Sequence, residues 1–303
     1  MRTTNVFKTL AFVLLGVTFM SAQAPRTWVS GVGDDANPCS RTAPCKSFAG
    51  AISKTLSGGE ISVLDPGGFG AVTITKPITI DGGGGQVASI TASGVNGIIV
   101  NSGTGNVTLR NLRINGVGTG ANGIRWLSGG SLHVENCYVF GFTGNGIDIA
   151  KSEGGQAFIV DSVLADNGGA GVKALDTVNT VSVTISRSRF EHNQFGIFSS
   201  DFSKFSVSDS DASGNTNTGI IAQSAAGNSV INVARSTAAN NTNSGIFAGG
   251  GATASTIRLN GVAIHGNVAT GIFVVGGSQV ISFTNTNTNS DPVNGTVTTT
   301  APF

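Results

Sequence analysis

A glycine followed by Ile or Val recurs along most of the chain at nearly constant spacing. The glycines are Gly97, Gly123, Gly146, Gly171, Gly196, Gly219, Gly245 and Gly271. Their spacings are 26, 23, 25, 25, 23, 26 and 26 residues. A repeat of this length is typical of one coil of a solenoid, in which loops on one side absorb the differences in length.

Each repeat also contains a stretch in which apolar and polar residues alternate, as in 107–114, 183–190 and 205–212. Alternation with a period of two predicts a strand whose first and third residues face inward. A polar triplet then bends the chain, a shorter strand follows, and the Gly-Ile strand completes the coil. Because three short strands bury their inner faces only when coils stack, the sequence predicts an all-β, single-stranded parallel β-helix of about ten coils.

Two columns of residues recur at the bends of this predicted coil. An asparagine precedes the Gly-Ile strand in five consecutive coils, at Asn167, Asn193, Asn215, Asn241 and Asn267. Asparagine tolerates left-handed backbone and its amide can bond to neighbouring coils, which predicts a structural asparagine ladder. The second column is Leu112, Cys137, Ser162, Ser188, Ser210, Ser236 and Val262. It predicts a serine stack in the core rather than a row of nucleophiles.

These features, together with the opening segment 58–74 (GGEISVLDPGGFGAVTI), resemble the pectate-lyase-like superfamily of right-handed parallel β-helices. The resemblance extends from residue 31 to the C-terminus and is nearest to secreted bacterial β-helix repeat proteins. It implies a right-handed solenoid. It also implies polysaccharide as a partner, since lyases and uronate epimerases of this superfamily work on one outer face. The motifs are specific for the fold and unspecific for activity.

The N-terminus predicts an exported protein. Residues 1–24 read as a signal peptide, with Arg2 and Lys8 before an apolar stretch that is too short to span a bilayer. The small residues Ala22 and Ala24 fit a cleavage site. We therefore expect a periplasmic or extracellular protein without membrane insertion.

The region 25–57 is predicted to form a loop and a helix that covers the open end of the core. Ser47 suits the N-cap, Phe48, Ile52 and Leu56 fall on one helical face, and Gly58 can end the helix. The β-helix then spans 58–285, and 286–303 forms a C-terminal cap or tail. In an exported chain, Cys39 and Cys45 predict a disulfide, whereas Cys137 reads as a buried small hydrophobe.

Charge excludes some functions. The net charge is +1 and only 11% of residues are charged, so the chain lacks the basic surface expected for nucleic-acid binding.

The turn column Asp161, Arg187, Asp209 and Arg235 alternates in sign, which predicts a salt-bridge ladder. That alternation argues against a calcium site, because calcium needs carboxylates on neighbouring coils. No cofactor is predicted.

The strongest catalytic candidates surround residue 136. Strand parity places Arg110 beside Glu135 with His133 on the same outer face, and Arg113 beside Tyr138 in the next outward column. His or Arg as base, Tyr as acid and Arg as carboxylate ligand would suit β-elimination or epimerisation. The alternative is a surface ion pair with an incidental tyrosine.

An apolar outward column follows the later glycines, at Phe198, Ile221, Phe247 and Phe273. Such a stripe needs a cover, which loops, the C-terminal tail, an oligomer or a partner could supply. Two functions stay open. One is a polysaccharide-binding or polysaccharide-modifying protein, including a lyase or epimerase, and the other is a non-catalytic structural or adhesive rod.

Overall fold

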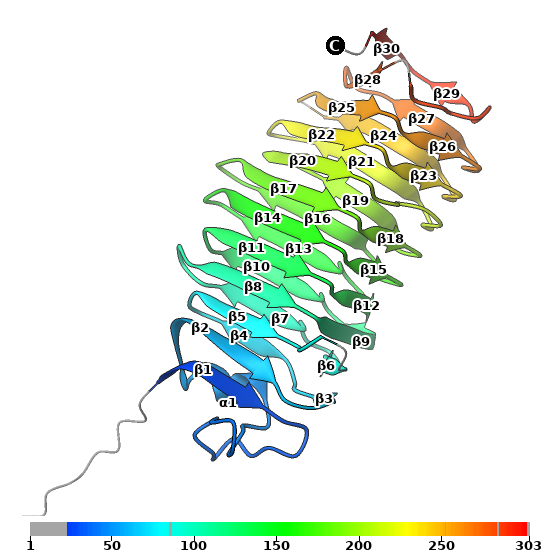
Figure 1. Cartoon of the computed structure of the whole chain (residues 1–303). Helices are drawn as coiled ribbons and strands as arrows, with labels where there is room; N and C mark the ends of the chain where they lie inside the picture. Colours follow the sequence, from blue (N-terminus) through cyan, green and yellow to red (C-terminus); the bar gives the residue numbers. More distant parts are fainter. Residues whose placement is uncertain (1–22, 85–86, 252, 284, 302–303) are drawn as a thin grey trace, which may run out of the picture.

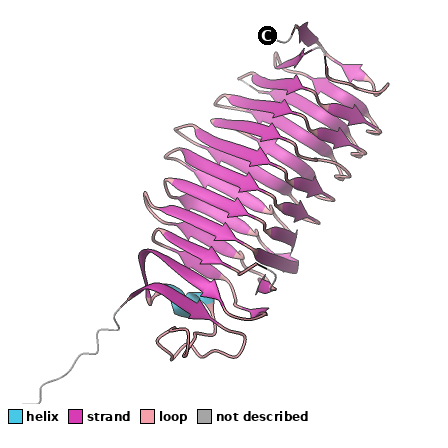
Figure 2. Cartoon of the chain, in the orientation of Figure 1, coloured by secondary structure: helices cyan, strands magenta, loops and turns pink. Residues whose placement is uncertain are grey.

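The computed structural model describes residues 23–84, 87–251, 253–283 and 285–301. They form an elongated rod of parallel strands with one short helix near the N-terminal end (Figure 2). The strands make a parallel β-solenoid of about nine turns, close to the ten that the repeat predicts (Figure 1). The predicted signal peptide lies almost wholly outside the described residues.

Three parallel sheets run along the rod. Sheet A contains β1 (Ala24–Val29), β2 (Thr55–Val63), β5 (Ile78–Asp81), β8 (Asn106–Arg110), β11 (Ser131–Glu135), β14 (Gly155–Val160), β17 (Val181–Ser186), β20 (Ser203–Ser208), β22 (Ser229–Ala234), β25 (Ser255–Asn260), β28 (Gln279–Phe283) and β30 (Val297–Thr300). Sheet B contains β3 (Gly67–Gly68), β6 (Ala88–Thr91), β9 (Leu112–Gly120), β12 (Tyr138–Phe142), β15 (Val163–Ala165) and β18 (Arg189–Glu191). The pair β23 (Thr237–Ala239) and β26 (Ala263–His265) continues sheet B through single bridges at Asp211.

Sheet C holds the Gly-Ile strands. Its members are β4 (Val72–Ile74), β7 (Ile98–Asn101), β10 (Ile124–Ser128), β13 (Ile147–Lys151), β16 (Ala170–Asp176), β19 (Phe195–Ser199), β21 (Thr218–Ser224), β24 (Ser244–Gly250), β27 (Thr270–Val274) and β29 (Val293–Asn294). The register aligns each apolar residue after the glycine with its counterpart in the next coil, as Ile124 with Ile147. The glycine is needed because sheets B and C approach closely. A Cβ on Gly123 would lie 2.2 Å from a Val139 methyl group and 2.4 Å from the Gly146 carbonyl oxygen.

The five predicted ladder asparagines stack inside the bend before sheet C, and all are buried. In the middle of the ladder, Asn215 Nδ2 donates to Asn241 Oδ1 and to the Phe190 carbonyl, each at 3.0 Å. Asn215 Oδ1 accepts the backbone N–H of Asn193 at 3.1 Å. The ladder therefore pairs buried polar groups that the bend would otherwise leave unsatisfied.

The expectation that the ladder asparagines take left-handed backbone is wrong. The left-handed residue is the one before, with φ of 54° at Asp166, 55° at His192 and 55° at Asn240. Gly214 and Gly266 fill the same position in the other two coils, each with φ of 68°. The ladder asparagine is therefore required because its side-chain amide bonds to neighbouring coils. The residue before it is required to adopt the left-handed backbone conformation.

The predicted serine stack lies in the core at the bend between sheets A and B. Ser188 Oγ accepts the Ser162 N–H at 3.2 Å and donates to the Ser186 carbonyl at 2.9 Å. Ser162 Oγ likewise accepts a hydrogen bond from the Cys137 N–H, at 3.1 Å. Each hydroxyl thus replaces a strand partner at the bend, and none is free to act as a nucleophile.

The N-terminal helix is shorter than predicted. Helix α1 (Phe48–Ile52) begins after Ser47, whose side chain accepts the Gly50 N–H at 2.9 Å. Phe48 packs inward with its ring 5.2 Å from that of Phe69. Leu56 lies in β2 and is 42% exposed, because the chain has already left the helix to pair with β1. The role of α1 as a cap stays a prediction.

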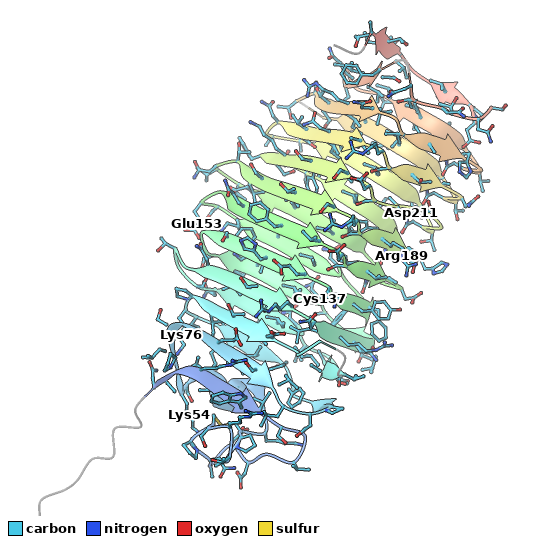
Figure 3. All side chains as sticks on the ribbon, viewed as in Figure 1. Lys54, Lys76, Cys137, Glu153, Arg189 and Asp211 are labelled. Atoms are coloured by element: carbon cyan, nitrogen blue, oxygen red, sulfur yellow. A yellow bond between two sulfur atoms is a disulfide. The ribbon has the colours of Figure 1, made fainter. Side chains whose placement is uncertain are left out.

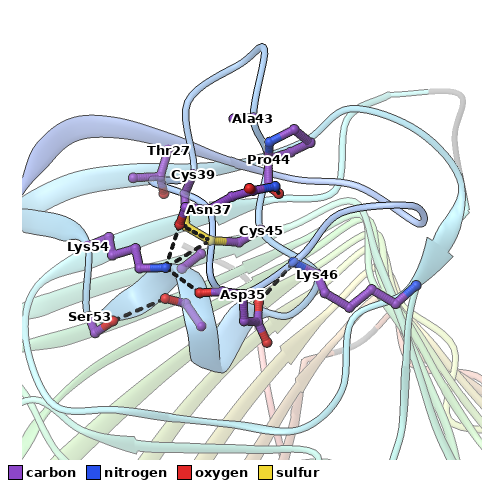
Figure 4. The surroundings of a disulfide bond; sticks show 12 residues. Thr27, Asp35, Asn37, Cys39, Ala43, Pro44, Cys45, Lys46, Ser53 and Lys54 are labelled. Carbon is purple, nitrogen blue, oxygen red and sulfur yellow. Dashed lines mark hydrogen bonds between the residues drawn. A yellow bond between two sulfur atoms is a disulfide. The ribbon is translucent and has the colours of Figure 1, made fainter.

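Strand β1 lies in a segment expected to be a loop. It pairs in parallel with β2 and is the first strand of sheet A. A loop closed by a disulfide between Cys39 and Cys45 lies against it (Figure 4). The Trp28 N–H donates to the Cys39 carbonyl and the Cys45 N–H to the Trp28 carbonyl, both at 2.9 Å. The Lys54 ammonium donates to the carbonyls of Asp35 and Asn37, just before this loop.

The C-terminal segment 286–303 continues the solenoid within its described part. Strand β29 pairs with β27 and β30 with β28, at the red end of the rod (Figure 1). Asp291 takes the next position of the asparagine ladder. Its Oδ2 accepts the N–H and the Nδ2 of Asn267, both at 2.9 Å.

Candidate functional site

The predicted catalytic residues lie on two sides of one corner. His133 and Glu135 belong to β11 on the outer face of sheet A, and the register aligns Glu135 with Arg110 of β8. Tyr138 begins β12 in sheet B and is aligned with Arg113 of β9. The bend between the two strands separates the residues into a sheet A group and a sheet B group.

The sheet A group has the expected register, but Arg110 forms its ion pairs with other residues. Arg110 aligns with Glu135, but its Nε lies 2.9 Å from Asp81 Oδ2 and its Nη2 lies 3.3 Å from Glu60 Oε2. Burial raises the pKa of Asp81, yet hydrogen bonds from Asn111 and a backbone N–H, together with Arg110, bring it below its ordinary value. Arg110 therefore belongs to a cluster of ion pairs with Asp81 and Glu60, which lies toward the N-terminal end of the rod.

His133 also has a neighbour that the sequence did not suggest. Its ring stacks on Phe158 of the next coil, with centroids 4.6 Å apart and planes at 19°. Both side chains lie on the outer face of sheet A and are partly exposed. His133 is therefore part of an aromatic stack on the outer surface of sheet A and does not pair with Tyr138.

The sheet B group forms a compact cationic and aromatic cluster. The Arg113 guanidinium carbon lies 4.9 Å from the ring centroid of Tyr138 and 4.8 Å from that of Phe140. The two rings stack on each other at 4.4 Å. A cation over two rings is attracted to their negative faces, so the rings hold the exposed guanidinium in place.

This cluster borders a recess of about 270 Å³ at the corner between sheets A and B. Its polar lining comprises the side chains of Asn111, Arg113, Asn136, Tyr138 and Asp161, and Cys137 marks this position on the rod (Figure 3). Three predicted residues, Arg110, His133 and Glu135, do not line it. The recess combines a guanidinium, two amides, a phenol and a carboxylate.

Backbone geometry explains why polar groups gather there. The corner residue of each coil is left-handed, with φ of 59° at Asn111, 49° at Asn136 and 50° at Asp161. Asn and Asp tolerate this conformation better than other side chains. Next to the recess, β9 carries three extra residues, because Phe140 aligns with Asn115 but Phe142 with Gly120. The coil is therefore widened beside the cluster.

Farther along the same corner the polar residues pair with each other. Arg187 binds Asp161 through Nε at 2.7 Å and Nη2 at 2.9 Å, and Arg235 binds Asp209 at 2.8 Å through both atoms. These hydrogen bonds lower the pKa of Asp161 and raise that of Arg187. The alternating column is thus a set of salt bridges, as its signs predicted.

A larger hollow of about 420 Å³ lies on sheet A in the C-terminal half. Its lining is small and neutral apart from Arg258 and Phe283, and Arg258 contacts Asn232 at 3.5 Å. It offers fewer specific groups than the corner recess.

The apolar stripe faces outward from sheet C in the expected register. Ile221 is nevertheless buried, with 5% of its surface exposed. The phenylalanines are partly buried by one another, since Phe198 packs edge-on against Phe195 and Phe247 against Phe273. A role of this stripe as a partner surface stays a prediction.

Other chemistry is limited in the part of the chain that the structure describes. There, no group of three or more His, Cys, Asp or Glu side chains is arranged to hold a metal ion. Burial raises the pKa of the Cys137 thiol to about 12, so the thiol stays neutral at physiological pH. No helix among the described residues is long and apolar enough to cross a membrane.

Residues 123–288 match the family model described as the right-handed β-helix region. The chain belongs to this right-handed β-helix family. No curated protein sequence matches this β-helix protein.

Among solved structures, the β-helix protein is similar to the pectate lyase Pel9A, with 18% identity, a TM-score of 0.61 and coverage of 92% of this chain and 78% of that one. The alginate lyase from Paenibacillus sp. str. FPU-7 is 15% identical, with a TM-score of 0.61 and coverage of 91% and 100%. The A-module of the mannuronan C-5 epimerase AlgE4 from Azotobacter vinelandii is 18% identical, with a TM-score of 0.56 and coverage of 74% and 67%. At these identities the likeness shows the shared fold.

Proposed function

We propose that this β-helix protein binds an acidic polysaccharide at the corner recess. The observation that carries the proposal is the Arg113 guanidinium, exposed at the recess and held over the rings of Tyr138 and Phe140. A guanidinium presents a planar fork of donors that matches a uronate carboxylate. The described residues provide no salt bridge to Arg113, so its donors are available.

The other lining groups suit the rest of a sugar. Asn136 donates to Asn111 and Asn111 donates to Asp81, both at 2.8 Å, so these two amides offer hydroxyl groups their remaining N–H donors and the Asn136 oxygen. The partly exposed Tyr138 offers an aromatic face and a phenol. The structural neighbours are named for pectate, alginate and mannuronan, which are acidic polysaccharides, and this supports the ligand class.

The geometry favours binding over elimination. A lyase or epimerase needs a base and an acid at one sugar ring. Tyr138 lines the recess, but His133 stacks on Phe158 on the other sheet, and Arg110 is engaged by Asp81 and Glu60. The expected pairing of His133 or Arg110 as base with Tyr138 as acid is therefore unsupported.

The second candidate is a non-catalytic structural or adhesive rod. It is favoured by the regular ladders of the C-terminal half, where serines, asparagines and Asp–Arg pairs satisfy one another from coil to coil. Export stays a prediction, which the Cys39–Cys45 disulfide supports because such bonds persist in oxidising compartments.

The proposal is tested by affinity electrophoresis and calorimetry of the intact chain with pectate, alginate and hyaluronan. We expect binding to at least one of them and at least about ten-fold weaker binding by Arg113→Ala, since a charge-assisted pair is lost. Arg235→Ala is the matched control, because this arginine is exposed but bound to Asp209 in the regular half. It should bind as the wild type does.

Unsaturated uronate products are measured by ultraviolet absorbance on the same samples. The account predicts binding without product. Product that disappears in Tyr138→Phe would instead make the recess a lyase site. If no polymer binds, or if Arg113→Ala and Arg235→Ala weaken binding equally, the recess is not the site and the structural rod becomes the better reading.

A further inference from the structure

A second recess, of about 390 Å³, lies at the N-terminal end of the rod between β1 and the disulfide loop. Its lining includes Arg26, Trp28, Arg41 and Ser62. Trp28 and Trp126 are the two tryptophans of the chain. Trp28 is partly exposed in the recess, whereas Trp126 is fully buried with the Lys151 ammonium 4.2 Å from its ring centroid. An exposed indole on a surface with few aromatic residues marks a contact position.

The charges around Trp28 are not equivalent. Arg26 lies over the indole, with its guanidinium carbon 5.6 Å from the ring centroid, and it also binds Glu60 at 3.1 Å. Its Nε donates to Ser62 Oγ at 2.9 Å. Arg41, by contrast, is exposed and pairs with no carboxylate among the described residues. Arg41 therefore gives the recess an uncompensated positive charge.

The disulfide loop fixes Arg41 at this place. Arg41 and Thr42 form the tip of a turn that is closed by the Ala43 N–H, which donates to the Ser40 carbonyl at 3.2 Å and to Ser40 Oγ at 3.1 Å. Cys39 and Cys45 flank the turn and are joined by the disulfide (Figure 4). Their backbone groups are bonded to Trp28. These bonds hold the backbone of the turn, and with it Arg41, beside Trp28.

We propose that this recess is a second binding site for an acidic sugar. The Arg41 guanidinium binds the carboxylate, the Trp28 ring packs against the C–H face of the sugar, and Ser62 lies within the same hollow. Strand β1 is three strands before β8 in sheet A, so the recess lies roughly 14 Å along the rod from the coil of Arg110. The ligand class rests on the proposed function, because one polymer along the rod could occupy both recesses.

Tryptophan emission tests this site in the intact, oxidised chain, because Trp126 is shielded and Trp28 is not. The probes are oligosaccharides cut from pectate and alginate, with a neutral oligosaccharide of equal length as the control ligand. We expect a saturable change in emission with an acidic probe and none with the neutral one. Arg41→Ala should weaken this titration at least about ten-fold. Arg41→Lys should weaken it less, and Thr42→Ala, an exposed neighbour on the same turn, should leave it unchanged.

The outcomes separate this proposal from the corner recess. A Trp28 titration that survives Arg113→Ala but not Arg41→Ala supports two sites. Polymer binding that depends on Arg113 without any change in emission overturns the second site and leaves the first. An unchanged titration in Arg41→Ala, with the fold verified by circular dichroism, also overturns it. If Arg41→Ala does not fold, Arg41→Lys and the neutral probe decide, and equal responses to acidic and neutral sugars contradict the proposal.

Discussion

The two halves of the rod use the same coil in different ways. From Ser162 to Ser236 the bends are uniform, with stacked serines, stacked asparagines and Asp–Arg pairs. Before Ser162, the same positions hold Cys137 in the serine column, Phe142 at the ladder position, and Asn111 and Asn136 at the charged corner. The corner charges pair with each other in the regular half, whereas in the irregular half Asn136 donates to Asn111, Asn111 donates to Asp81, and the nearby Arg113 has no salt bridge among the described residues. The candidate site lies where the repeat is broken. This is expected, because functional residues often replace the residues that the regular repeat would require.

The largest expected effect is loss of a ladder amide in the regular half. Asn215→Ala removes the acceptor of the Asn193 N–H and the donor to the Phe190 carbonyl, and both groups stay buried. We expect the free energy of unfolding to fall by about 3 kcal/mol, measured by chemical denaturation with circular dichroism.

The matched control is Asn243→Ala, an exposed asparagine that donates to Asn217 Oδ1 at 3.1 Å. It should change the free energy of unfolding by less than about 0.5 kcal/mol. Equal losses for the two variants would contradict the view that the buried ladder stabilises the regular half.

A smaller effect is expected from making the irregular half regular. Cys137→Ser extends the serine stack, because the new hydroxyl can donate to the Glu135 carbonyl as Ser162 donates to that of Val160. Stability should change by less than about 1 kcal/mol. The reciprocal variant Ser188→Ala leaves the buried Ser162 N–H without its acceptor and should cost about 1–2 kcal/mol. A larger loss for Cys137→Ser than for Ser188→Ala would show that the two halves are not built from one coil.

Much of the fold was accessible from sequence because it depends on local repetition. The glycine period follows from the close approach at Gly123, and the asparagine column follows from an amide that each bend needs. The sequence did not predict β1, since residues 24–29 lie before the region that carries the glycine repeat. Asp291 was missed as the end of the ladder because a carboxylate replaces the amide there.

The site was less accessible because it depends on side-chain direction. Register predicted that Arg110 aligns with Glu135 and Arg113 with Tyr138, and both alignments hold. Strand register does not determine whether a long side chain points toward the preceding coil or toward the following one. Arg110 turns toward Asp81, in a coil without the repeat signature, and Phe140 joins Arg113 from two residues beyond Tyr138. One feature of the sequence could have pointed to the recess, namely an asparagine at the same corner position in two successive coils. These residues, Asn111 and Asn136, are hydrogen-bonded to each other at 2.8 Å.

Hydrogen–deuterium exchange of the intact chain, with and without a saturating acidic oligosaccharide, tests the central claim most directly. The account predicts slower exchange at 111–115 and 136–140, around the corner recess, with the regular half unchanged. Protection confined to the hollow between Thr184 and Phe283, or no protection anywhere, would contradict the assignment of binding to the broken part of the repeat.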